Sequence, residues 1–232
     1  MKICILTIAT NKYLQFVEKL YDSIEENFLN GHEISCLLFT DHEVETSDNI
    51  KVHYIDHEPW PMPTLKRYNY FVKEKDFILQ HDYCFYLDAD MRIDNSVGDE
   101  ILTDGIVATM HPYQSFYPKE QRSYDRNPKS LAYVPFGHEG ENYYAGGFNG
   151  GTTEEFIKMS EIIADRVNKD LENGVIALWH DESQMNRYLI DNKPSLSLTP
   201  SYCWAEEFYE NSNYPYEPKI IALKKNHSEL RN

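Results

Sequence analysis

The sequence predicts an α/β protein in which helices cover the faces of a parallel β-sheet. Short apolar runs alternate with segments of helical periodicity along the first half of the chain, which is the pattern of a parallel sheet. The 232 residues are 41% hydrophobic and 14% aromatic, so the chain can bury a sizeable core. The sequence contains no internal repeat and no linker, and we therefore expect one domain.

The expected strands are apolar or alternating runs bounded by polar residues, glycine or proline. In chain order they are residues 2–10, 33–39, 51–55, 83–87, 105–110, 175–178, 195–199 and 219–223.

Two helices are expected between the early strands. Leu20 and Ile24 continue an apolar repeat at helical spacing over residues 16–28, and the Asn30-Gly31 pair ends that helix. A proline-rich loop at residues 59–63 precedes a second helix, which begins near Thr64.

Two further helices are expected in the second half. Residues 152–155 resemble a capping box that opens a long helix, and Asn173-Gly174 closes it. Asp181, with Gln184 three residues on, is predicted to cap another helix that carries Met185 and Tyr188.

Composition limits the partners and the compartment. A formal net charge of −16 opposes nucleic acid and anionic membrane surfaces. The four cysteines, at positions 4, 36, 84 and 203, are too few and too widely spaced for a disulfide framework or zinc site, so we expect buried reduced thiols. No stretch approaches the length of a membrane span, and the chain begins directly with a strand-like run. We expect a soluble, cytoplasmic protein.

The most informative feature is the apolar run Tyr83–Leu87, which leads directly into Asp88-Ala89-Asp90. Carboxylates just past a strand lie at the rim of the sheet, where ligands bind in open α/β folds. Mg²⁺ and Mn²⁺ prefer carboxylate oxygens and bridge such pairs to phosphates. A solvated turn after the strand is the alternative.

A second cluster of reactive side chains is Trp179-His180-Asp181-Glu182, at a predicted helix start. A carboxylate there can act as a base, as a nucleophile toward an anomeric carbon or as a stabiliser of an oxocarbenium-like state. A plain helix cap beside a tryptophan is the alternative.

Glycine and basic residues provide two further signals. Residues 143–151 hold two Gly-Gly pairs, which allow either close approach of a ligand or a structural bend, and they do not fit a dinucleotide-binding motif. The tail, with Lys224, Lys225 and Arg231, could close over a diphosphate or remain a solvated end. The Lys66-Arg67 pair could meet an anion at a helix start.

Several ordered segments together resemble glycosyltransferase family six, which includes the ABO blood-group transferases, the α1,3-galactosyltransferase and the Forssman synthase. They are YCFYLDADM (83–91), TMHP (109–112), YDRNPKSLAYVP (124–135), YYAGGFNGG (143–151), WHDESQMNRYL (179–189) and KNHSELRN (225–232). The resemblance implies a GT-A fold, a Rossmann-like mixed sheet with an acceptor-binding part. Residues 1–110 would mainly bind the nucleotide sugar. Residues 111–232 would mainly serve acceptor binding and catalysis, with a closing C-terminal tail.

The resemblance also implies transfer of galactose or N-acetylgalactosamine (GalNAc), with retention, from a UDP-sugar to the 3-hydroxyl of a galactoside such as lactose or fucosylated lactose. Glu182 matches the glutamate proposed as nucleophile or stabiliser in the family. Asp88 and Asp90 match the carboxylates that hold Mn²⁺, with Mg²⁺ as an alternative. The matched donor-binding positions are Ile8, Ala9, Thr10, Tyr13, Arg67, Asp88, Ala89, Asp90, Ala145, Gly146, Gly147, Asp181, Lys225 and Arg231. The matched acceptor-binding positions are His111, Ser123, Trp179 and Trp204.

Departures from the family pattern shape the expectation. Bacterial members with Asn-X-Asn at the metal position work without metal, whereas the Asp-Ala-Asp of this chain predicts metal dependence. Gly147 leaves room for an N-acetyl group, so UDP-GalNAc is expected over UDP-Gal. Ala205 stands where animal enzymes have an acidic acceptor contact, so acceptor preference does not carry over. A haloacid-dehalogenase-like phosphatase and a non-catalytic sugar- or nucleotide-binding module are the alternatives.

Overall fold

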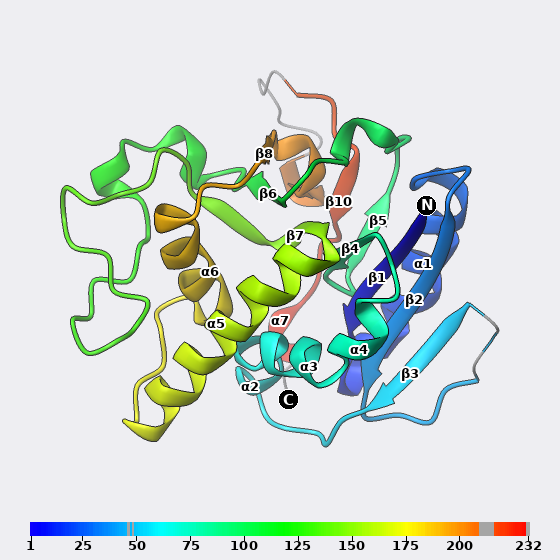
Figure 1. Ribbon diagram of the computed structural model, residues 1–232, viewed down its shortest axis with the longest axis horizontal. Coiled ribbons are helices and arrows are strands. Elements are labelled where there is room, and N and C mark those ends of the chain that lie inside the picture. The colour runs from blue at the N-terminus through cyan, green and yellow to red at the C-terminus, as the bar shows by residue number, and fades with distance from the viewer. Residues whose placement is uncertain (46, 48, 209–215, 231–232) are drawn as a thin grey trace.

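The computed structural model describes residues 1–45, 47, 49–208 and 216–230, and its centre is a mixed seven-stranded sheet (Figure 1). The strand order is β3-β2-β1-β4-β7-β6-β8. The strands are β1 (Lys2–Ile8), β2 (Glu33–Thr40), β3 (Ile50–Tyr54), β4 (Tyr83–Leu87), β6 (Ile106–Met110), β7 (Tyr144–Thr152) and β8 (Leu196–Leu198). Strands β1 to β4 are parallel, and β7 runs antiparallel to β4 and β6. The α/β prediction is confirmed, and the mixed sheet agrees with a GT-A-like fold.

A smaller three-stranded sheet has the order β5-β10-β9. Its strands are β5 (Met91–Ile93), β9 (Trp204–Ala205) and β10 (Ile220–Ala222). Strand β5 begins directly after the Asp88-Ala89-Asp90 turn, and β10 directly precedes the C-terminal segment. This small sheet therefore joins the aspartates to the chain's last residues.

Helices cover both faces of the large sheet, as Figure 1 shows. The helices are α1 (Val17–Asn27), α2 (Met62–Leu65), α3 (Arg67–Lys73), α4 (Lys75–Ile78), α5 (Thr153–Glu172), α6 (His180–Asp191) and α7 (His227–Leu230). On one face Leu6 and Phe39 pack against Phe71 of α3 and Phe156 of α5. On the other, Ile5 and Phe85 pack against Leu20 and Phe28. Successive residues of each strand pack into cores on opposite faces of the sheet, because strand side chains alternate with a period of two residues.

The two Gly-Gly pairs of the glycine-rich run do not form a separate bend, which was one of the two expectations, and their close approach to a ligand stays a prediction. The run forms β7, in the middle of the sheet, where its glycines allow close packing. A Cβ at Gly150 would overlap the Cys84 carbonyl and the Phe85 ring of the neighbouring strand. Gly151 has a φ of 142°, in the range that favours glycine.

Three other expectations need correction. Residues 175–178 form no strand, because the chain turns there: the Val175 amide bonds back to the Asp170 carbonyl (2.8 Å) at the end of α5. Neither predicted cap makes a side-chain bond: α5 has Thr152 as its N-cap residue without one, and α6 begins at His180, which places Asp181 inside its first turn.

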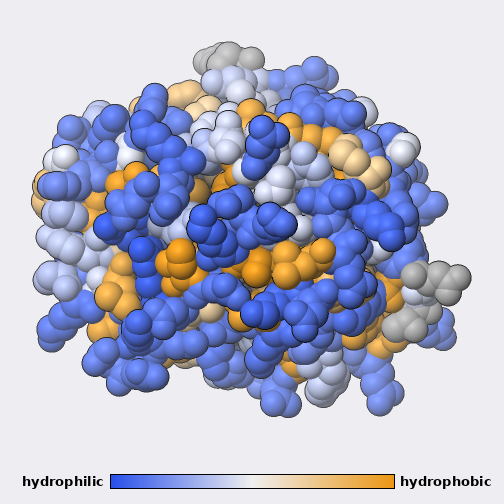
Figure 2. Space-filling view, viewed as in Figure 1, coloured by the Kyte–Doolittle hydropathy of each residue, from blue (hydrophilic) through white to orange (hydrophobic). Residues whose placement is uncertain are grey.

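The surface agrees with the composition. On the face that carries α3 and α5, most of the area is hydrophilic, and hydrophobic residues show as smaller groups between polar ones (Figure 2). The four cysteines are all buried free thiols, as expected. Within the described residues, no helix combines the length and the apolar character needed to cross a bilayer.

Candidate active site

A pocket of about 490 Å³ opens at the carboxyl ends of β1 and β4. These neighbouring parallel strands end at Ile8 and Leu87, so the residues that follow them meet at one edge of the sheet. The pocket wall contains nine residues that the sequence assigned to donor or acceptor binding, namely Ile8, Thr10, Tyr13, Arg67, Asp88, Ala89, Asp90, Trp179 and Lys225.

The Asp88-Ala89-Asp90 turn forms the floor of this pocket. Its backbone is held on both sides, because the Asp88 amide donates to the Gly147 carbonyl (3.0 Å) and the Asp90 carbonyl accepts from Leu223 (2.8 Å). The Asp88 side chain is 36% exposed, whereas that of Asp90 is 3% exposed and pairs with the Lys225 ammonium. The Lys225 ammonium therefore lies against the buried Asp90 carboxylate, and this position favours a positively charged group.

Metal ligation by protein side chains alone is not supported in the described part of the chain, where no group of three or more His, Cys, Asp or Glu side chains is placed to hold an ion. Asp88 and Asp90 supply carboxylate oxygens, which are the ligands that Mn²⁺ and Mg²⁺ accept. The chemistry of this pair fits a divalent ion whose remaining ligands come from a substrate or water.

Arg67 joins the aspartate turn to the second cluster. Its buried guanidinium donates to the Gly146 carbonyl (2.7 Å) and to Asp88 Oδ1 (3.2 Å), and its Nε lies 3.0 Å from Asp181 Oδ2. The guanidinium also lies over the ring of Tyr86, 4.1 Å from its centroid, and the Tyr86 hydroxyl donates to Asp88 Oδ1 (2.6 Å). One fixed cation thus orients both carboxylates. Its neighbour Lys66 pairs instead with Glu58.

Asp181 and Glu182 lie in the first turn of α6. The Asn186 side chain holds this helix to β7, since it exchanges hydrogen bonds with the backbone of Tyr144 in both directions (2.8 Å each). Glu182 Oε2 accepts from the Gly146 amide (2.8 Å), and Oε1 accepts from the Tyr143 hydroxyl (3.0 Å). The catalytic candidate is therefore fixed at both oxygens.

Burial raises the pKa of both acids. For Asp181 the pKa rises to about 7, opposed by Arg67 and assisted by the charges of Asp88 and Glu182. For Glu182 burial also raises the pKa to about 7, although the Gly146 and Tyr143 donors counteract it. Perturbed acids beside a pocket are typical of a reaction site.

Two of the predicted acceptor residues, His111 and Ser123, contact Tyr143, whose hydroxyl bonds to Glu182. Burial lowers the pKa of His111 to about 4, so its ring is neutral at pH 7. Its Nδ1 accepts from the Tyr113 amide (3.1 Å), which leaves the proton on Nε2 as a donor. The Ser123 hydroxyl and amide pair with the Gln114 side chain at 3.0 and 2.9 Å.

The comparisons with known proteins agree with this geometry. The sequence profile described as "Glycosyltransferase family 6" matches residues 1–232. The chain belongs to glycosyltransferase family 6. It is 32% identical over 97% of its length to the histo-blood group ABO system transferase 1 of Rattus norvegicus, and the match covers 67% of that relative.

Two other relatives represent different enzymes of the family. The globoside alpha-1,3-N-acetylgalactosaminyltransferase 1 of Gallus gallus is 31% identical over all of this chain and 70% of its own. The O-antigen biosynthesis glycosyltransferase WbnI of Escherichia coli is 31% identical over 97% of this chain and 95% of its own.

Family 6 membership makes this protein a hexosyltransferase that uses a sugar-nucleotide donor and a glycan acceptor. The phosphatase alternative has no support from these relatives.

The structure separates some predicted residues of the family 6 enzyme from the pocket wall. Ala9 is fully buried behind it, Ala145 is 4% exposed in the core, and Trp204 is 1% exposed on β9. Trp179 is 49% exposed at the pocket rim. The prediction for Arg231 lies outside the described residues.

Two tyrosines of this candidate site were not predicted from the sequence. Tyr86 lies in the predicted buried strand, two positions before Asp88. The period of two in a strand places both side chains on the same side, so this contact could have been expected. Tyr143 is the first residue of the run 143–151, and its partner Glu182 is 39 residues away. Only the fold reveals that second contact.

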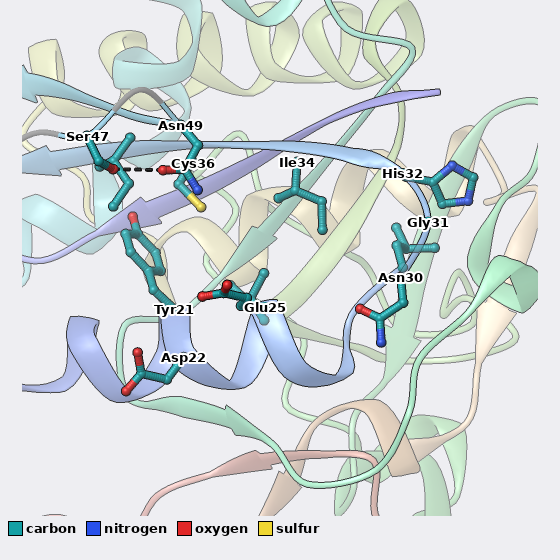
Figure 3. Close-up of a pocket in the computed structure, with 13 residues that line it drawn as sticks. Tyr21, Asp22, Glu25, Asn30, Gly31, His32, Ile34, Cys36, Ser47 and Asn49 are labelled. Carbon is teal, nitrogen blue, oxygen red and sulfur yellow. Dashed lines mark hydrogen bonds between the residues drawn. The ribbon is translucent and has the colours of Figure 1, made fainter.

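A second hollow of about 410 Å³ lies between α1 and β2, and Figure 3 shows its lining. Tyr21, Asp22 and Glu25 of α1 belong to its lining, and Tyr21 points from the helix toward Cys36. The Ser47 hydroxyl donates to the Asn49 side chain (2.7 Å) at its edge. None of the site residues predicted for the glycosyltransferase is among the described residues of this wall. The pocket at the ends of β1 and β4 and this hollow have different linings.

Proposed function

We propose that this enzyme transfers GalNAc, and less readily galactose, from its UDP-sugar to the 3-hydroxyl of a β-galactoside such as lactose or fucosylated lactose, with retention of configuration. The observation that carries the proposal is the Arg67 network, in which one guanidinium contacts Asp88, Asp181 and the Gly146 carbonyl. A diphosphate at Asp88 and a sugar at Asp181 would then be adjacent, as the two halves of a nucleotide sugar are.

The donor would lie along the pocket wall in a defined order. Uracil and ribose would pack near Ile8, Thr10 and Tyr13, and the diphosphate would meet the Asp88–Asp90 turn and Lys225. The Lys225 ammonium also lies 5.7 Å from the Tyr13 ring centroid, so the tail and the base-binding side are already close. A pocket of about 490 Å³ has the size expected for a small-molecule site.

Mn²⁺, or Mg²⁺ in its place, would be held by Asp88 and Asp90. When bound, the ion would neutralise charge on the diphosphate and stabilise it as a leaving group. Lys225 would supply a second positive charge at the same end of the donor.

Glu182 would act at the anomeric carbon. A carboxylate fixed at both oxygens can attack that carbon or stabilise an oxocarbenium-like state. Both roles require the ionised form, so transfer should rise with pH through the pKa of about 7.

The preference for GalNAc rests on Gly147. A Cβ there would lie 3.1 Å from Asp88 Oδ2 and 3.3 Å from Cys203 Sγ, and it would press on the Met91 methyl group. These contacts mean that only glycine lets β7 pack this closely against the Asp88 turn. The preference for UDP-GalNAc itself is carried over from the family position that Gly147 matches. Two further statements remain predictions: residues 1–110 mainly bind the nucleotide sugar and residues 111–232 mainly serve acceptor binding and catalysis, and the protein is cytoplasmic.

The decisive experiment measures UDP release from UDP-GalNAc and UDP-Gal with lactose or fucosylated lactose as acceptor, in Mn²⁺ and in EDTA. We expect faster turnover of UDP-GalNAc and loss of activity in EDTA. Faster turnover of UDP-Gal would overturn the donor assignment, and an EDTA-insensitive rate would overturn the metal assignment.

The catalytic assignment needs its own variant and control. Glu182→Gln should abolish transfer, whereas Glu172→Gln, at an exposed position near the end of α5, should leave it unchanged. Full activity of Glu182→Gln would refute the role of Glu182.

A further inference from the structure

Tyr143 stands out as a buried polar residue that contacts the predicted catalytic acid and to which neither the sequence nor the family comparison assigned a role. Its hydroxyl donates to Glu182 Oε1 (3.0 Å), while the Gly146 amide donates to Oε2 (2.8 Å). Both donors come from the same segment, at the beginning of β7. The carboxylate would lose one or both bonds if it rotated, so this segment sets its orientation.

The Tyr143 ring is itself immobilised. It is fully buried and packs edge-on against Tyr124 (5.0 Å between centroids) and His111 (5.8 Å). Its carbonyl accepts from the His111 amide (2.8 Å). A ring held on two sides gives its hydroxyl little freedom, and a fixed donor is what positioning of a reacting group requires.

The chemistry of the donor is also suited to this task. Burial and the neighbouring Glu182 raise the pKa of the Tyr143 phenol well above its usual value, so it remains a proton donor at neutral pH. A hydrogen bond to the charged form of an acid favours that form. Tyr143 therefore supports the ionised state that Glu182 needs, against the burial that disfavours it.

Tyr143 also touches the acceptor side. Its hydroxyl lies 3.5 Å from the Ser123 carbonyl, and its ring contacts His111, so both predicted acceptor residues next to Glu182 adjoin the same tyrosine. A residue in this place can keep the carboxylate, the donor sugar and the acceptor hydroxyl in one arrangement.

We propose that Tyr143 is a positioning residue that holds the Glu182 carboxylate in its reactive orientation between the donor and acceptor sides; this inference rests on the proposed function. We expect the effect on the chemical step and not on donor affinity, because within the described residues the Tyr143 hydroxyl bonds to Glu182 and Ser123, and neither residue lines the pocket.

The test compares Tyr143→Phe, which removes one hydroxyl, with Tyr124→Phe in the same cluster. The Tyr124 hydroxyl donates to the Asn142 carbonyl (3.0 Å) and not to Glu182. For Tyr143→Phe we expect kcat to fall roughly 10- to 100-fold with KM for the UDP-sugar within about twofold. The acid limb of its pH profile should move up by about one pH unit.

Other charged and titratable groups around Glu182 stay in place in both variants. They are Arg67, Tyr68, Asp88, His111, Asp181 and Cys203. A shift confined to Tyr143→Phe is therefore assigned to the lost hydroxyl. An unmoved kcat and pH profile, or an equal shift in Tyr124→Phe, would overturn the proposal.

A second measurement separates this inference from the proposed function. If the wild-type protein transferred no sugar from either donor, the proposed function would fail, but the contact could still be tested by urea unfolding. Tyr143→Phe should then lower the unfolding midpoint more at pH 8, where Glu182 is ionised, than at pH 5. An equal loss at both pH values would overturn the assignment to Tyr143.

Discussion

Replacing Glu182 by glutamine should make the stability of this protein less dependent on pH. Burial raises the pKa of Glu182 from its usual 4.5 to about 7, so the fold favours the protonated acid. Below pH 4.5 the group is protonated in both the folded and the unfolded chain, and its stabilising contribution is complete. As pH rises through 7 that contribution is lost, because the unfolded chain ionises more easily than the folded one.

The magnitude follows from the difference between the two pKa values. At about 1.4 kcal/mol per pH unit, it corresponds to about 3 kcal/mol of unfolding free energy lost between pH 4.5 and pH 8. Glutamine cannot ionise, so the variant should escape this loss. The glutamine side chain has only one oxygen and cannot accept from both Tyr143 and Gly146. The loss of one hydrogen bond changes the stability of the variant equally at every pH.

Urea unfolding at several pH values between 4.5 and 8 measures the effect. The stability of Glu182→Gln relative to wild type should rise by about 3 kcal/mol over this range, or roughly 6–12 °C in melting temperature for a chain of this size. Glu172→Gln is the matched control and should track the wild type, because its side chain is exposed. A constant difference between Glu182→Gln and wild type would show that Glu182 is not buried as an acid of raised pKa.

Three other substitutions test the donor pocket. Arg67→Met leaves Asp88 and Asp181 without their shared cation and should lower the free energy of unfolding at pH 8 by about 3–5 kcal/mol, measured in urea. Lys225→Met should weaken UDP binding roughly 10-fold by calorimetry, through loss of a charge at the phosphates. Gly147→Ala should reduce kcat/KM for UDP-GalNAc more than for UDP-Gal, because the family position that Gly147 matches is expected to face the N-acetyl group.

Each substitution has a control or a contradicting result. A loss below about 1 kcal/mol in Arg67→Met would mean that the two carboxylates need no shared cation. Lys224→Met, one position before Lys225, should leave UDP affinity unchanged. An equal loss of affinity in that variant would mean that the net charge of the tail, and not Lys225 itself, attracts UDP. An equal fall for both donors in Gly147→Ala would place the selectivity elsewhere.

The early strands and helices could be predicted because their signals are local. The first four strands, and the helices that follow β1 and β3, need only apolar periodicity and glycine or proline ends. The strand β7 could not be predicted in this way, because its composition is that of a loop. Its glycines are needed for contact with the neighbouring strand, as at Gly150 against Cys84 and Phe85, and that contact exists only in the assembled sheet.

The site residues also divide into those with a local sequence signal and those whose contacts arise only in the fold. Asp88 and Asp90 follow a strand, and Glu182 follows a tryptophan at a helix start, so their chemistry was visible in short segments. The Arg67 bridge to Asp181 and the Tyr143 contact with Glu182 join residues far apart in the chain. No local pattern carries such pairings, and the raised pKa values follow from burial that only the fold provides.

Transfer of a hexose from UDP to a galactoside, with retention, is the activity that we propose for this site. Incubation with UDP-GalNAc, Mn²⁺ and lactose, followed by NMR of the trisaccharide, tests it most directly. We expect a single product in which GalNAc is α-linked to the 3-hydroxyl of galactose. A β-linked product, or hydrolysis of the donor with no trisaccharide from any galactoside, would contradict it.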